Sequence, residues 1–181
     1  MKHRYTPPTP VNRGDVIDVA VDALDIEDSN APPPTVGSLT TWLLTFNPAN
    51  TPDAVELPGH TVWTPELHAV RSGGITAYVA HTRDTRHDRD RRLSTGTFTG
   101  TMLGGSTPDD LPTTTGIVLE LHVRHQIYRE TRPHSLLPVP GSDTLRPVIR
   151  SPKWFDRETM VSGRDCGIES GLIITMAVPR Q

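Results

Sequence analysis

The sequence predicts a mainly β protein, a single-domain small β-barrel or β-sandwich with one short helix and long loops rich in proline and glycine. Three observations lead to this fold class. The 181 residues include 18 prolines and 14 glycines, which favour turns and interrupt helices. Several apolar runs have the length of a strand, and some alternate with polar residues at period two. The chain also has the length of one domain, so these strands would share one core.

The first part of the chain predicts a flexible terminus followed by two strands. Residues 1–10 are polar and proline-rich, and we expect them to be a flexible N-terminal segment outside a single β-rich domain at residues 11–181. Ile17, Val19 and Val21 alternate with Asp18, Ala20 and Asp22, which indicates a half-buried strand. Residues 27–37 contain three consecutive prolines and predict a surface loop, since proline donates no hydrogen bond to a sheet. Residues 39–46 are rich in β-forming side chains and predict a core strand.

The middle of the chain predicts the short helix and an exposed charged loop. Thr64 can cap a helix that has Pro65 at its first position and ends near Val70. A strand is expected over residues 75–82. Residues 81–92 carry five arginines and three aspartates. Such mixed charge belongs in water, so we expect an exposed charged loop between two halves of one domain.

The second half predicts four more strands. Residues 93–104 contain three glycines, which suggests a bent strand, and a hairpin would join it to the most regular strand of the sequence, residues 116–128. Pro147 places residues 145–149 at a sheet edge. Residues 171–178 are almost continuously apolar and predict a buried C-terminal strand.

The charge and cysteine content exclude several classes of protein. The formal net charge of −3 disfavours a general basic surface for nucleic acids or membranes. The single cysteine, Cys166, excludes an intrachain disulfide framework and a multi-cysteine zinc site. We find neither a signal peptide nor an apolar stretch of membrane-spanning length. We therefore expect a cytoplasmic protein that does not bind membranes.

A group of residues in the second half occurs in the order found in a known family. These residues are Asp110, Leu111 and Pro112, then 115–118, His125, Tyr128, 137–142, Leu145 and Trp154. In these residues the chain resembles an uncharacterised family of small proteins from high-GC bacteria, catalogued as a domain of unknown function. The resemblance covers roughly residues 93–156, and its most specific part is the Pro-Val-Pro-Gly-Ser segment after His-x-x-Tyr. It implies a small β-rich protein and transfers no catalytic residue, cofactor or substrate, and the family's Trp- and Cys-rich opening is absent here.

His125 and Tyr128 are the candidate catalytic residues. Together they could offer a proton acceptor and a phenolic donor at the end of the regular strand, as a small hydrolase or isomerase would require. The alternative is that both side chains hydrogen-bond the Pro-Val-Pro-Gly loop. His122 and His125 are three residues apart on a strand and point to opposite faces, which disfavours binding of one metal ion by both. We expect no metal site and no cofactor.

Two charged clusters are candidate binding regions. Arg83, Arg86, Arg89, Arg91 and Arg92 could contact the phosphates of a nucleic acid. Aspartates lie between them and no aromatic side chain lies among them to stack on bases, so nucleic-acid binding is possible but not favoured. The acidic residues within 15–28 could bind a cation or a basic partner, although a strand would simply place several of them in solvent.

No recognisable catalytic or cofactor-binding signature occurs in the sequence. We therefore expect a non-enzymatic β-rich binding module for a protein or a small ligand, whose identity the residues do not indicate. The alternatives are a nucleic-acid-associated protein that uses the loop from Arg83 to Arg92, and an enzyme around His125 and Tyr128.

Overall fold

The computed structural model describes residues 15–29, 31–48, 54–57, 61–64, 68–79, 95–101, 112–132, 135–157, 159–163 and 165–179. Within these ranges the protein is mainly β, with twelve strands and one short helix, so the predicted fold class is confirmed at this level. The helix is α1 (Ala23–Glu27). The strands are β1 (Asp15–Asp22), β2 (Leu39–Pro48), β3 (Val55–Glu56), β4 (Val62–Thr64), β5 (Ala69–Ser72), β6 (Ile75–Val79), β7 (Thr95–Thr101), β8 (Thr114–Arg132), β9 (Ser135–Pro138), β10 (Thr144–Pro147), β11 (Thr159–Ser162) and β12 (Asp165–Val178).

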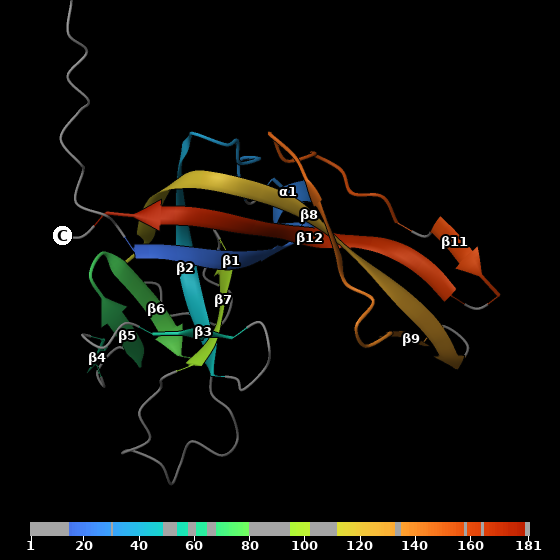
Figure 1. The fold of residues 1–181 in the computed structure, drawn as a ribbon, viewed down its shortest axis with the longest axis horizontal. Helices are drawn as coiled ribbons and strands as arrows, with labels where there is room; N and C mark the ends of the chain where they lie inside the picture. Colours follow the sequence, from blue (N-terminus) through green and yellow to red (C-terminus); the bar gives the residue numbers. More distant parts are fainter. Residues whose placement is uncertain are drawn as a thin grey trace, which may run out of the picture.

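Five of the strands pair in a closed circuit, in the order β8, β12, β1, β7, β2 and back to β8. β1 and β7 run parallel, and the other four pairs of the circuit are antiparallel. β6, β5 and β4 extend the sheet from β2, and β10 lies beside β8. Figure 1 shows β8, β12 and β1 side by side, with β2 crossing their direction.

The core lies inside this circuit. Each of its five strands contributes a side chain of which 2% or less is exposed: Val19 from β1, Trp42 from β2, Phe98 from β7, Leu121 from β8 and Ile174 from β12. Along β1 the buried residues alternate with exposed or half-buried ones, as the period-two pattern predicted. Burial of these large side chains from distant parts of the sequence therefore stabilises the closed arrangement.

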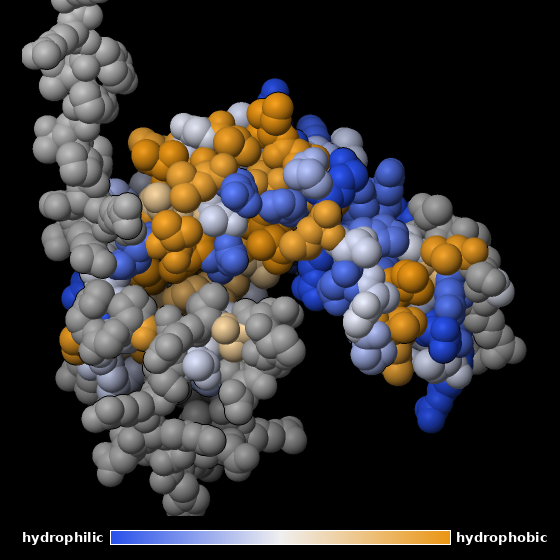
Figure 2. All heavy atoms as spheres, viewed as in Figure 1, coloured by the Kyte–Doolittle hydropathy of each residue, from blue (hydrophilic) through white to orange (hydrophobic). Residues whose placement is uncertain are grey.

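Apolar side chains also gather on the outer side of the sheet. We call the solvent-facing side of β1, β12 and the first half of β8 the outer face. Figure 2 shows hydrophobic residues along β8 and β12 on the side toward the viewer, interrupted by hydrophilic ones. Val16, Ile117 and Leu119 belong to this face and are 58%, 43% and 44% exposed.

The two longest strands leave the circuit together and form a projection. We call this projection the arm; it comprises residues 125–132 of β8, β9, β11 and residues 165–169 of β12. In Figure 1 the arm extends to the right of the remaining strands. Because β8 and β12 belong both to the circuit and to the arm, the arm is continuous with the core sheet.

A bulge in β12 marks the place where the arm begins. Glu169 pairs with His125 and Gly171 pairs with Arg124, so Ser170 is an extra residue without a partner on β8. Gly171 has a φ of +145°, which residues other than glycine rarely adopt. A Cβ atom at this position would overlap the carbonyl oxygen of Val21. Glycine at this position therefore lets β12 bend close to the end of β1.

Most predicted strands are confirmed, but the helix predicted from Thr64 to about Val70 is wrong at both of its ends, and residues 65–67 between them lie outside the described residues. β4 ends at Thr64, and Ala69 and Val70 lie in β5, where they pair with β6. The short helix is instead α1. There the Asp22 carboxylate accepts a hydrogen bond from the Leu24 N–H at 2.8 Å and caps the helix, so that strand β1 turns directly into helix.

The predicted hairpin between residues 93–104 and 116–128 is also wrong. β7 pairs with β1, β2 and β3, whereas β8 pairs with β2, β9, β10 and β12. Both sides of β7 are thus occupied by strands from the first half of the chain. The flexible segment expected at residues 1–10 and the charged loop expected at residues 81–92 lie outside the described residues.

Candidate functional site

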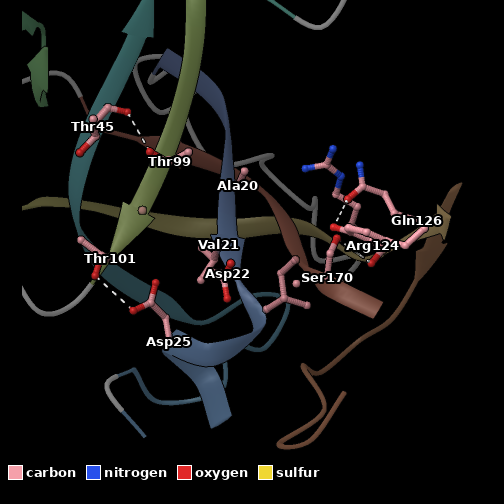
Figure 3. A pocket seen from close by; sticks show the side chains of 14 residues that line it. Ala20, Val21, Asp22, Asp25, Thr45, Thr99, Thr101, Arg124, Gln126 and Ser170 are labelled. Atoms are coloured by element: carbon pink, nitrogen blue, oxygen red, sulfur yellow. Dashed lines mark hydrogen bonds between the residues drawn. The ribbon is translucent and has the colours of Figure 1, made fainter. Parts of the chain in front are cut away.

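A cleft of about 380 Å³ lies where the arm joins the closed circuit (Figure 3). One side consists of β1, the start of α1, β7 and β2. The other side consists of the central part of β8 and the bulge of β12. The cleft exists because the arm bends away at Gly171, so that the outer side of β1 and β7 faces the first residues of the arm.

The acidic side of the cleft comes from the junction between β1 and α1. Asp22 and Asp25 line it one helical turn apart. One oxygen of Asp22 caps α1, and Asp25 accepts a hydrogen bond from the Thr101 hydroxyl at 3.3 Å. Figure 3 shows Asp25 and Thr101 joined across the gap between α1 and β7. These contacts fix the two carboxylates at one end of the cleft.

Threonine hydroxyls from β2 and β7 form the wall beside the carboxylates. Thr99 accepts a hydrogen bond from the Asn47 side-chain amide at 3.1 Å, and its own hydroxyl lies 3.5 Å from the Thr45 carbonyl oxygen. Thr45 and Thr99 stand directly opposite each other in the β2–β7 register. This wall therefore presents the Thr99 hydroxyl in an orientation that contacts from β2 hold.

The arm supplies hydrogen-bond donors to the opposite side. Arg124, Gln126 and Tyr128 alternate along β8 and share the face that lines the cleft. The Tyr128 hydroxyl donates to the side-chain oxygen of Gln126 at 3.0 Å, and this leaves the Gln126 NH₂ group as a donor. Arg124 donates from Nε to Asp143 at 2.6 Å, which orients the guanidinium. The cleft thus has carboxylate acceptors at one end and amide and guanidinium donors at the other.

The two candidate catalytic residues do not meet. Pairing between β8 and β12 is regular from Arg129 to His125, so His125 and Tyr128 point to opposite faces of the strand. Tyr128 lines the cleft, whereas the His125 ring contacts the place that a Cβ atom of Gly167 would occupy. The two side chains therefore cannot act on one ligand in this conformation.

The Pro-Val-Pro-Gly-Ser segment is a turn that Ser142 holds against β8. The Ser142 hydroxyl accepts from the Ile127 N–H at 3.0 Å and donates to the Val139 carbonyl oxygen at 2.7 Å. Gly141 has a φ of +73°, which suits the turn. The alternative expectation that Tyr128 hydrogen-bonds this loop is wrong, because its hydroxyl donates to Gln126.

Two other acidic residues of the group at residues 15–28 serve the fold. Glu27, with a side chain only 9% exposed, accepts a hydrogen bond from the Phe155 N–H at 2.9 Å and pairs with Arg157. Its carboxylate therefore anchors the segment after β10. Asp18 accepts from the Thr175 hydroxyl at 2.6 Å across β1 and β12.

An exposed ion pair joins the two long strands within the arm. Nε and Nη2 of Arg129 each donate a hydrogen bond to one carboxylate oxygen of Asp165, both at 2.7 Å. The hydrogen bond and the positive charge of Arg129 lower the pKa of the Asp165 carboxyl, and burial opposes this shift only in part. The same hydrogen bond raises the pKa of Arg129. The pair fixes the register of β8 against β12 near the end of the arm.

The remaining sequence candidates lie elsewhere or outside the described part. Arg83, Arg86, Arg89, Arg91 and Arg92 fall outside the described residues. Within the described ranges, His, Cys, Asp and Glu form no group of three or more that could hold a metal ion. No helix in that part of the chain is long and apolar enough to cross a membrane.

Comparisons of the chain with protein-family models, with curated proteins and with solved structures gave no match.

Proposed function

We propose that the protein is a non-enzymatic binding module that holds a small, uncharged, polyhydroxylated ligand such as a sugar in the cleft at the base of the arm. The observation that carries this proposal is the opposition of carboxylate acceptors to amide and guanidinium donors across a space of about 380 Å³. This volume lies in the range of about 300–1,000 Å³ typical of small-molecule sites.

Hydroxyl groups fit this lining better than other groups do. A hydroxyl can donate to Asp22 or Asp25 and, at the other end of the ligand, accept from Gln126 or Arg124. The threonine wall offers further partners of both kinds. The carboxylates and the amide and guanidinium donors of the lining disfavour a purely aromatic or aliphatic ligand, because such a ligand would leave these polar groups without hydrogen-bond partners. Since the cleft is open to solvent on one side, we expect millimolar affinity.

The test is a titration of the ¹⁵N-labelled protein with glucose, mannose, N-acetylglucosamine and trehalose, followed by ¹H–¹⁵N NMR. We expect at least one sugar to shift the Gln126 side-chain amide and the backbone amides of Gly100 and Gly171, which line the cleft. Asp25→Asn should weaken this binding about tenfold, which corresponds to about 1.4 kcal/mol. Asp28→Asn, which neutralises an exposed carboxylate outside the cleft lining, is the matched control and should bind as the wild type does.

Two outcomes would overturn the proposal. If no sugar shifts the cleft amides at about 50 mM, the cleft does not bind this class, because such a concentration exceeds the expected dissociation constant. If the zwitterion glycylglycine produces the shifts and the sugars do not, the ligand is one that carries separated charges.

A further inference from the structure

The outer face, together with the adjoining start of β2, carries a row of apolar side chains across four adjacent strands. Val16 pairs with Ala177, Ala177 with Ile117, and Ile117 with Leu39. Partners directly opposite each other share one face of a sheet, so the four side chains stand in line. Leu39 and Val16 are 71% and 58% exposed, and they are among the most exposed large apolar side chains of the described residues.

The rows on either side of this apolar row differ in their hydrogen-bonding character. On one side, Asp18, Thr175 and Glu120 stand in register, and both carboxylates are exposed. On the other side, Thr41 pairs with Thr115, and their hydroxyl oxygens lie 2.8 Å apart. One hydroxyl of the threonine pair uses its hydrogen in that bond, and the other keeps its hydrogen for an outside acceptor.

We propose that a second copy of this chain docks on the outer face, related by a two-fold axis that runs along the apolar row. Rotation about this axis lays the apolar row of each copy on that of the other. It also exchanges the two flanking rows, so the Glu120 carboxylate faces the hydroxyl of the partner's Thr115. Acceptors thus meet donors on both sides of an apolar centre, and like charges do not face each other.

The size of the face suits a reversible dimer. Its edge adds Leu119, which is 44% exposed. The exposed apolar surface of the row and of Leu119 is roughly half of the roughly 800 Å² that each partner gives to a standard interface. A dissociation constant of micromolar order is therefore expected rather than an obligate dimer.

The test is sedimentation equilibrium of the purified wild-type protein at concentrations up to about 200 µM. We expect a monomer–dimer equilibrium whose dissociation constant rises at least tenfold in Ile117→Lys and in Leu39→Lys. Both positions are solvent-exposed on the monomer, so circular dichroism should show both variants folded. Leu137→Lys, at a 54% exposed position on the arm, is the matched control and should dimerise like the wild type.

Each other result would overturn the proposal. A wild-type protein that remains monomeric at about 200 µM has no self-association through this face at the expected strength. A dimer that is unchanged by both lysine substitutions uses another surface, and a dimer that only Leu137→Lys disrupts uses the arm. The result is independent of sugar binding, because the cleft and the row share no residue.

Discussion

Replacement of Gly171 by alanine should be the most destabilising small change at the base of the arm. The added Cβ would overlap the carbonyl oxygen of Val21 and lie 3.0 Å from the backbone nitrogen of Ala23. Both obstacles are backbone atoms of β1 and α1, so no side chain can rotate away to make room. The φ of +145° adds conformational strain for any residue with a Cβ.

Two costs add at this position. Overpacking in a close-packed region costs about 1–3 kcal/mol, and a backbone conformation that residues with a Cβ avoid costs about 1–3 kcal/mol more, giving about 2–6 kcal/mol in all. Gly141→Ala is the matched control. Gly141 has a φ of +73° but nothing within 4 Å of the added Cβ, so only conformational strain of about 1–2 kcal/mol applies.

Urea denaturation followed by circular dichroism measures both free energies of unfolding. Because both variants carry conformational strain, a larger loss in Gly171→Ala than in Gly141→Ala reports mainly the clash of β12 with β1. If Gly171→Ala loses no more stability than Gly141→Ala, then β12 does not approach the end of β1 as closely as described, and the account of the bulge is refuted.

Three further changes have expected outcomes that urea denaturation can measure. The Trp42 indole N–H is buried without a hydrogen-bond partner among the described residues, so Trp42→Phe should change stability by no more than about 1 kcal/mol, whereas Trp42→Ala should cost about 3–5 kcal/mol. A large loss with phenylalanine would mean that the N–H has a partner. Glu27→Gln should cost about 1–3 kcal/mol, because the near-buried carboxylate holds Arg157 and the Phe155 N–H; unchanged stability would contradict the anchor. The Arg129 pair lowers the pKa of Asp165, so its stabilisation is present above the unfolded-state pKa and is lost as the pH falls through the lower folded-state value. Asp165→Asn should reduce this acid-side loss of stability, and a pH dependence identical to that of the wild type would show that the pair contributes nothing.

Strands with strong local patterns could be predicted from the sequence. The alternation at Ile17, Val19 and Val21 corresponds to β1, and the apolar run at residues 171–178 lies in β12. Both strands could be predicted because the pattern of neighbouring residues in each reflects which side chains are buried. The helix was misplaced for a related reason. Asp22 continues the alternation of β1 and also caps α1, and the sequence pattern showed only the first of these roles.

The candidate site was only partly predictable, because pairing between distant strands creates it. Tyr128 was a candidate and lines the cleft, and the acidic group at residues 15–28 includes both cleft carboxylates. Arg124, Gln126 and Ser170 were not candidates, since no local motif distinguishes them. They face Asp22 only because β12 joins β8 to β1 and bulges between them.

The pairing of β1 with β12 also constrains how the chain can fold during synthesis. Residues of β1 meet partners that the ribosome adds about 150 residues later. At a translation rate of about 5–20 residues per second, the apolar side of β1 lacks its partner strand for roughly ten seconds or more. Until then the circuit cannot close, so the nascent chain exposes an unpaired strand edge to which chaperones or other nascent chains can bind.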